Sequence, residues 1–182
     1  MTICGIDEAG RGPLAGPLVM AGVVFIKRVY KLDDSKKLSA QMREKLYEKI
    51  INATQYKIVI INNEIIDQKG ISACITQGLK EILNALKAQK YIFDGNSKFG
   101  VEKVEPVIKA DQTVKEVMAA SILAKVTRDR IMCEMDRLYP EYGFCKHKGY
   151  GTKEHIEAMK KYGLSPIHRK SFRPKALQPT LF

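Results

Sequence analysis

The chain has 182 residues and a formal charge of +11 at neutral pH, with 45% hydrophobic and 28% charged residues. This length fits one domain with a full hydrophobic core, and no run approaches the roughly 18 apolar residues that span a membrane. The positive charge favours a polyanionic partner. Because the N-terminus lacks the pattern of a secretory signal, we expect a cytoplasmic protein, and a monomer is the simplest expectation for its assembly.

Apolar periodicity and turn residues predict the elements of the first half of the chain. In chain order they are an antiparallel hairpin of strands at 2–7 and 17–26, a helix that Ser39 caps, a third strand at 56–61, and a helical segment at 63–88 that breaks near Lys69 and Gly70.

Two short strands and two helices are predicted in the second half: strands at 91–94 and 104–108, a long helix after Asp111, and a last helix at 152–162. Thr113 and Glu116 fit a capping box for the long helix. The order of elements indicates an α/β domain around one mixed sheet. We expect a catalytic domain at 1–140, with a basic helical segment at 141–182 packed on it.

Acidic side chains follow three of the predicted strands. Asp7 and Glu8 end the first strand, Asp94 ends the fourth, and Asp111 follows the fifth. Strand ends gather at one edge of an open α/β sheet, so these carboxylates can meet there. Their mutual repulsion favours a divalent cation, and ligands that are all oxygen favour Mg²⁺ or Mn²⁺. In a basic protein, a carboxylate cluster that binds such ions indicates cleavage of a phosphodiester bond with the help of two metal ions.

The adjacent pair Asp7 and Glu8 presents a geometric difficulty, because neighbouring side chains of a strand point to opposite faces. Either the strand bulges here, which Gly10 would permit, or one residue contributes through its backbone. Asp7 is the better candidate for a direct ligand. A single acid is more often a surface or capping group, and Asp111 could simply favour the nearby helix N-terminus.

The four cysteines lie far apart, without a C-x-x-C pair or zinc-finger spacing. They are predicted to be reduced thiols. Cys145 and His147 are interpreted as packing and surface residues rather than as ligands.

Six sequence blocks, in order, carry a family resemblance: GIDEAGRGPLAGP, LDDSKKLS, FDGN, KADQ, AASILAKVTRDR and YGFCKHKGYGT. Together they resemble bacterial ribonuclease HII, the type 2 ribonuclease H, over about residues 3–173. The resemblance implies the ribonuclease H-like fold, a mixed five-stranded sheet flanked by helices. It also implies endonucleolytic cleavage of RNA in RNA/DNA hybrids and incision at single ribonucleotides in duplex DNA, leaving 3′-hydroxyl and 5′-phosphate ends.

The same resemblance assigns roles to individual residues. The acidic quartet is Asp7, Glu8, Asp94 and Asp111. The turn Gly10-Arg11-Gly12 would read the ribose 2′-hydroxyl, and Tyr150 would stack on the neighbouring deoxyribose. Without the other blocks, the glycines would be interpreted as a tight turn and Tyr150 as a packing residue. The residues expected at the phosphates or near the site are Ser35, Lys36, Lys37, Asn96, Ser121, Lys125, Lys146, Lys148, Arg169 and Lys170.

The last five residues, QPTLF, resemble the Q-x-x-L-F peptides that dock on a sliding clamp. Gln178, Leu181 and Phe182 are therefore candidate clamp contacts, although so short a match also fits a frayed tail.

Two rival functions remain open from sequence. One is a basic hybrid-binding module with the same fold and no turnover. The other is a ribonuclease without metal, in which His147, His155 or His168 acts as acid and base.

Overall fold

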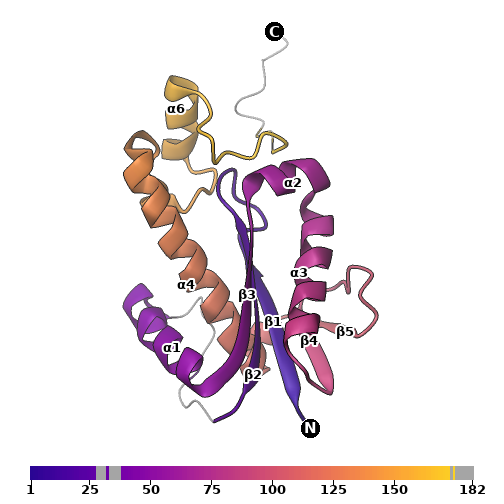
Figure 1. Ribbon diagram of the computed structural model, residues 1–182. Helices are drawn as coiled ribbons and strands as arrows, with labels where there is room; N and C mark the ends of the chain where they lie inside the picture. The colour runs from indigo at the N-terminus through magenta and orange to yellow at the C-terminus, as the bar shows by residue number, and fades with distance from the viewer. Residues whose placement is uncertain (28–31, 33–37, 173, 175–182) are drawn as a thin grey trace.

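The computed structural model describes residues 1–27, 32, 38–172 and 174. Figure 1 shows a central sheet with helices on both faces. In chain order the elements are β1 (Ile3–Ala9), β2 (Leu18–Phe25), α1 (Ala40–Ala53), β3 (Thr54–Ile61), α2 (Asn63–Lys69), α3 (Ile71–Ala85), β4 (Lys90–Asp94), β5 (Val104–Val107), the 3₁₀ turn η1 (Ala110–Gln112), α4 (Lys115–Leu138), the 3₁₀ turn η2 (Pro140–Tyr142), α5 (Phe144–His147) and α6 (Lys153–Tyr162).

The sheet has the strand order β3-β2-β1-β4-β5, which confirms the predicted mixed, five-stranded arrangement. β2 pairs antiparallel with both β1 and β3, as the hairpin prediction requires. β4 pairs parallel with both β1 and β5. Because β1 and β4 are parallel neighbours, their carboxyl ends meet at one edge of the sheet.

Two apolar clusters cover the two faces of the sheet. α2 and α3 pack on one face against Ile6, Leu18 and Met20. α1 and α4 pack on the other against Val19 and Ala21. Alternate residues of β2 therefore belong to different clusters, as the two-residue period of a strand dictates.

α4 approaches β1 unusually closely because of a glycine in the strand. A Cβ on Gly5 would lie 2.2 Å from the backbone carbon of Glu116. Ala119 and Ala120 of α4 are fully buried on the same face. Small residues on both partners thus allow the helix to hold the acidic edge of the sheet in place.

Most helix boundaries follow the predictions, with one exception. Ser39 caps α1 by accepting a hydrogen bond from the Met42 N–H at 3.2 Å, and the chain breaks between α2 and α3 at Gly70, where φ is +79°. The predicted capping box before α4 is wrong. The N-cap is Val114, without a side-chain bond, because η1 closes first and the Thr113 N–H donates to the Ala110 carbonyl.

The C-terminal segment packs against the end of α4 and the loop between β1 and β2. Its small core holds Ala15, Met132, Tyr142, Phe144 and Met159. None of the helices in the described part of the chain is both long and apolar enough to cross a membrane.

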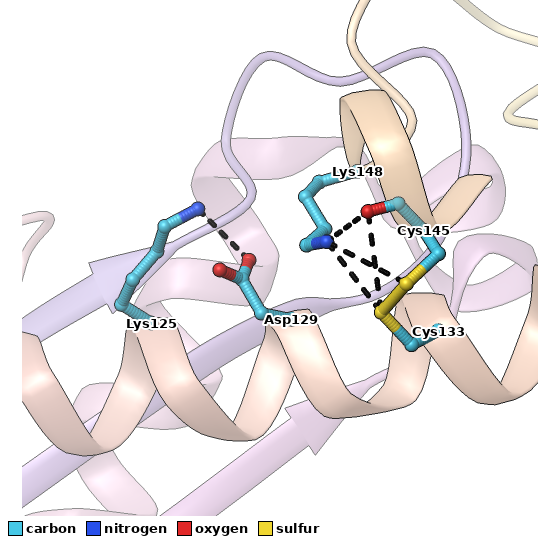
Figure 2. Close-up of a disulfide and its surroundings, with 5 residues drawn as sticks. All are labelled: Lys125, Asp129, Cys133, Cys145 and Lys148. Carbon is cyan, nitrogen blue, oxygen red and sulfur yellow. Dashed lines mark hydrogen bonds and ion pairs between the residues drawn. A yellow bond between two sulfur atoms is a disulfide. The ribbon is translucent and has the colours of Figure 1, made fainter. Parts of the chain in front are cut away.

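The prediction that all cysteines are reduced is wrong for one pair. Cys133 of α4 and Cys145 of α5 form a disulfide (Figure 2), whereas Cys4 and Cys74 are free and buried. The chain reverses direction through η2 and lays α5 against α4, which brings the two sulfurs together. A separation of 12 residues carries no motif that would reveal this contact in the sequence.

Candidate metal centre and nucleic-acid interface

Three aspartates from separate elements meet at the acidic edge of the sheet. Asp7 lies near the end of β1, Asp94 ends β4, and Asp111 lies in η1 after β5. One carboxylate oxygen from each lies within 4.8 Å of the others. Asp7 and Asp111 are buried, with 7% and 1% of their surfaces exposed. The strand ends therefore bring together acids that are far apart in sequence.

Backbone contacts hold these carboxylates in position. Asp94 Oδ1 accepts a hydrogen bond from the Ala110 N–H at 2.8 Å, which ties η1 to the end of β4. Lys109 turns the chain into η1 with a φ of +58°. Asp7 Oδ1 accepts a hydrogen bond from the Glu8 N–H at 2.8 Å. Main-chain N–H groups thus hold the carboxylates of Asp94 and Asp7 in place.

The electrostatics of the cluster favour a cation. Burial raises the pKa of Asp7 well above its ordinary value, and the charges of Glu8, Asp94 and Asp111 raise it further. A hard divalent ion would relieve both effects. Carboxylate oxygens at this separation are the donors that Mg²⁺ and Mn²⁺ prefer, so the residues fit such an ion.

Glu8 occupies a different position from the three aspartates. The pairing of β1 with β2 runs without interruption through Asp7, Glu8 and Ala9, so the bulge considered from sequence is absent. Asp7 therefore shares the α4 face with Ala9, and Glu8 points to the opposite face. The Glu8 carboxylate forms an ion pair with Arg11 at 2.8 Å.

A cleft of about 360 Å³ opens beside Asp7 and Asp94 of the cluster, and Asp111 is not part of its lining. It joins the acids to the loop after β1, to α1 and α4, and to the loop before α6. Its lining residues are Asp7, Glu8, Ala9, Gly10, Arg11, Gly12, Arg43, Asp94, Ser121, Lys125 and Tyr150.

The two glycines of the Gly10-Arg11-Gly12 turn have different environments. Gly10 has a φ of +97°, and a Cβ there would lie 2.2 Å from Nε of Arg128. The fold itself therefore requires glycine at this position. At Gly12 the backbone is not in the left-handed region, and a Cβ would meet nothing within 4 Å. Gly12 leaves open space beside the cleft that no packing contact explains.

The comparison with protein families decides which family this is. The family model described as Ribonuclease HII matches residues 4–175. The chain belongs to the ribonuclease HII family. A ribonuclease HII from Sulfurovum sp. is 60% identical over 181 residues, covering 99% of this chain and 96% of its own, and one from Campylobacter hominis is 57% identical over 183 residues, covering 100% and 99%.

Solved structures agree with this family and its fold. Ribonuclease HII from Archaeoglobus fulgidus, solved as a complex with PCNA, has a TM-score of 0.86 and 30% identity, and covers 98% of both chains. Ribonuclease H2 from Pyrococcus horikoshii has a TM-score of 0.80 and 31% identity over 94% of both. An RNase HIII in complex with Mn²⁺ (TM-score 0.71, 18% identity, 90% of this chain and 63% of that one) shows the shared fold.

Family membership establishes the general activity. As a ribonuclease HII family member, the chain is a metal-dependent hydrolase that cleaves the RNA strand of RNA/DNA hybrids. The ribonuclease H-like α/β fold predicted from sequence is confirmed. This activity removes the rival of a binding module without turnover.

The histidines do not support the metal-independent rival. All three are buried away from the cleft lining, and the rings of His147 and His155 stack with centroids 4.4 Å apart. Burial and the neighbouring His155 lower the pKa of His168 to about 4. The Ser165 N–H donates to His168 Nδ1, so the ring proton of His168 lies on Nε2. This Nε2 lies 3.0 Å from Nε2 of His155, and the two neutral rings share an internal hydrogen bond.

Tyr150 and Ser121 lie at the cleft, as the family resemblance implied. Tyr150 is 46% exposed, which does not fit a packing residue, and the Arg128 guanidinium lies 5.9 Å from its ring centroid. Ser121 donates to the Met118 carbonyl at 2.9 Å. Asn96 is exposed on the turn after β4 and is absent from the cleft lining.

The residues expected to contact phosphates differ in their exposure and in their partners. Lys146 is exposed and forms an ion pair with Glu154 at 2.7 Å. Lys148 lies at the disulfide, where it donates to the Cys145 carbonyl (Figure 2). Lys170 is exposed, and its N–H donates to Asp67. Ser35, Lys36 and Lys37 lie outside the described residues.

Arg169 lies in a different place from the phosphate-contacting surface expected from sequence. Its side chain is 1% exposed, and its guanidinium faces backbone carbonyls of the loop after β1. A basic residue in a polar segment is ordinarily solvated, so the sequence around Arg169 does not reveal that its side chain is buried.

Sequence reasoning missed two further arginines of this region. Arg43 of α1 lines the cleft. Arg128 of α4 donates a hydrogen bond to the Pro17 carbonyl at the end of the loop after β1. Arg128 belongs to the AASILAKVTRDR block, which was the available signal for it.

Proposed function

We propose that this family member incises duplex DNA on the 5′ side of single embedded ribonucleotides, as well as cleaving longer hybrids, and leaves 3′-hydroxyl and 5′-phosphate ends. Convergence of Asp7, Asp94 and Asp111 within 4.8 Å is the observation that carries this proposal. Those three residues, with Glu8 at the rim, would hold divalent metal, Mn²⁺ or Mg²⁺. When bound, two such ions would stabilise the attacking water and the leaving oxygen.

The residues around the acids supply substrate recognition in this proposal. Gly10, Arg11 and Gly12 line the cleft, and the open space at Gly12 allows a sugar to approach the backbone closely. Discrimination rests on the 2′-hydroxyl, which only the ribonucleotide carries. The exposed ring of Tyr150 offers a flat apolar surface for the adjacent deoxyribose.

Basic and polar residues around the cleft would bind the phosphate backbone. Lys146 and Lys170 are exposed, and Lys125 lines the cleft. These contacts would position the duplex without reading its sequence. The remaining proposed contacts are Ser35, Lys36, Lys37, Asn96, Ser121 and Lys148. With such a substrate, the protein would act in the bacterial cytoplasm, where DNA is replicated.

A labelled duplex with one ribonucleotide tests this function directly. The protein is incubated with it in Mg²⁺, in Mn²⁺ or in chelator, and the cut position is read. We expect incision 5′ to the ribonucleotide with metal and none in chelator. A need for several consecutive ribonucleotides, or cleavage in chelator, would contradict the proposal.

We also propose that the C-terminal peptide docks on a sliding clamp. The residues Gln178, Leu181 and Phe182, which lie outside the described residues, provide a polar contact and two apolar anchors. A structural relative with 30% identity was solved as a complex with PCNA. Deletion of Leu181 and Phe182 should abolish binding to an immobilised clamp and leave cleavage of a short duplex unchanged. Equal clamp binding by the deletion variant would refute docking by this peptide.

A further inference from the structure

Two arginine side chains lie beneath the loop that joins β1 to β2. Arg128 of α4 and Arg169 of the C-terminal segment are each 1% exposed. Each guanidinium donates three hydrogen bonds, and all six go to backbone carbonyls. A buried charge is costly unless its donors are satisfied, so these contacts make the burial possible.

Arg169 holds the part of this loop that lines the cleft. Its Nη2 donates to the Gly10 carbonyl at 2.6 Å and its Nη1 to the Arg11 carbonyl at 3.1 Å. Its Nε donates to the Gly16 carbonyl at 3.0 Å. The ring of Phe172, with its centroid 4.9 Å from the guanidinium, supports it from another side. The guanidinium is therefore fixed in direction as well as in position.

These contacts set the direction of two backbone N–H groups. In a trans peptide the carbonyl of one residue and the N–H of the next point in opposite directions, and no cis peptide occurs in the described part of the chain. Since the carbonyls of Gly10 and Arg11 point inward to Arg169, the N–H groups of Arg11 and Gly12 point outward. Gly10, Arg11 and Gly12 all line the cleft over the acids.

The charge of Arg169 also strengthens these donors. Burial, and then the charge of Arg128, lower the pKa of Arg169 to about 10, which leaves the side chain protonated at neutral pH. Hydrogen bonds to an ionised donor polarise the peptide groups that accept them. The outward N–H groups of the same peptide units are then better donors to an oxygen atom.

We propose that Arg169 is a positioning residue for ribose recognition, which fixes the carbonyls of Gly10 and Arg11 so that the N–H groups of Arg11 and Gly12 face a ribose hydroxyl in the cleft. This inference rests on the proposed function, because it assumes that the loop contacts the ribonucleotide. The side chain itself does not touch the substrate.

A simpler interpretation is that Arg169 only cross-links the loop to the C-terminal segment. Arg128 provides the matched comparison. It is equally buried and also donates to three carbonyls, those of Pro17, Ala15 and Lys148. None of these carbonyls belongs to the peptide units that present N–H groups at Gly10-Arg11-Gly12. Loss of either guanidinium should destabilise the protein, but only loss of Arg169 should impair ribose recognition.

The test measures ribose discrimination in the full-length Arg169→Lys variant, with Arg128→Lys as control. KM is measured for cleavage of a duplex with one ribonucleotide, and Ki for the all-DNA duplex of the same sequence as competitor. We expect the ratio of Ki to KM to fall about 10- to 100-fold in Arg169→Lys, the effect of losing one or two charge-assisted contacts, with Ki unchanged. Methylguanidine added to Arg169→Ala should restore part of the ratio.

A cross-linking role predicts a different result. Fewer folded molecules would lower the apparent kcat, while KM and Ki stay constant. An unchanged ratio in Arg169→Lys, or an equal fall in Arg128→Lys at the same thermal stability, would overturn the inference.

An NMR comparison keeps the inference testable if cleavage is lost. The amide proton resonances of Arg11 and Gly12 should move upfield in Arg169→Lys and stay in place in Arg128→Lys. Unchanged resonances in Arg169→Lys would overturn the inference. Wild-type protein that does not cut at the ribonucleotide would contradict the proposed function instead, and the NMR comparison would still test how Arg169 orients the loop.

Discussion

The acid cluster and the buried arginine pair lie on either side of one loop and manage buried charge in opposite ways. Asp7, Asp94 and Asp111 hold like charges together, and burial and repulsion raise the pKa of Asp7. Arg128 and Arg169 are also like charges, but backbone carbonyls accept all six hydrogen bonds described for them. The acids are thus built to receive an external charge, whereas the arginines are built to fix a backbone.

Replacing one acid should have the largest effect on activity. Asp94→Asn keeps the shape of the side chain but removes a charge that holds divalent metal. Loss of several kcal/mol of transition-state stabilisation corresponds to a fall of about 10³-fold or more in kcat, measured on a labelled hybrid. Binding to the same hybrid should persist. Asp129→Asn, which removes a charge from the half-buried ion pair with Lys125 (2.8 Å), is the matched control and should retain most of the activity.

Replacing Arg128 should mainly affect stability. Arg128→Met removes three donors from buried carbonyls, and we expect a loss of about 3 kcal/mol or more in the free energy of unfolding, measured with urea. Arg130→Met, which removes an exposed ion pair with Glu44, should cost about 1 kcal/mol or less. Similar losses of unfolding free energy in the two variants would show that the buried arginine stabilises the protein no more than the solvated one.

Substitution of the two glycines of the loop should affect stability to different extents. Gly10→Ala meets Arg128 and an unfavourable φ, so it should lower the free energy of unfolding by about 2 kcal/mol. Gly12→Ala should change that free energy by less than about 0.5 kcal/mol, because its Cβ meets nothing within 4 Å. The Gly12 variant should nevertheless cleave single-ribonucleotide duplexes more slowly. Unchanged cleavage would mean that the space at Gly12 is not used by the substrate.

The smallest effect is the pH dependence of stability without metal. The pKa of Asp7 is raised by burial and then by Glu8, so its protonated form is favoured in the folded state. Its contribution to stability is complete below the ordinary carboxyl pKa and is lost as pH rises through the raised value. In chelator, the free energy of unfolding of the wild type should therefore fall relative to that of Asp7→Asn as pH rises through the raised pKa. Mn²⁺ should remove the difference, and a pH-independent difference in chelator would argue against strain at Asp7.

The sequence predicted the local structure well where periodicity and caps are informative. The strands, the Ser39 cap and the break at Gly70 all depend on residues that are close along the chain. The capping box at Thr113 failed because Ala110, which accepts from the Thr113 N–H, belongs to a turn that the pattern did not reveal. The acids could be named from sequence because each follows a strand or lies in a recognisable block.

What the sequence alone determined is the set of elements, the acidic residues and the family that their blocks resemble, because these are encoded by local spacing and residue type. The packing of distant segments settled that Glu8 leaves β1 on the face opposite to Asp7, that Cys133 pairs with Cys145, and that Arg169 is buried under the loop. The contacts of Arg169 with Gly10 and Arg11 join residues 159 and 158 positions apart. Such contacts depend on how the chain packs, and a basic side chain in a polar segment has the same local sequence whether it is solvated or buried.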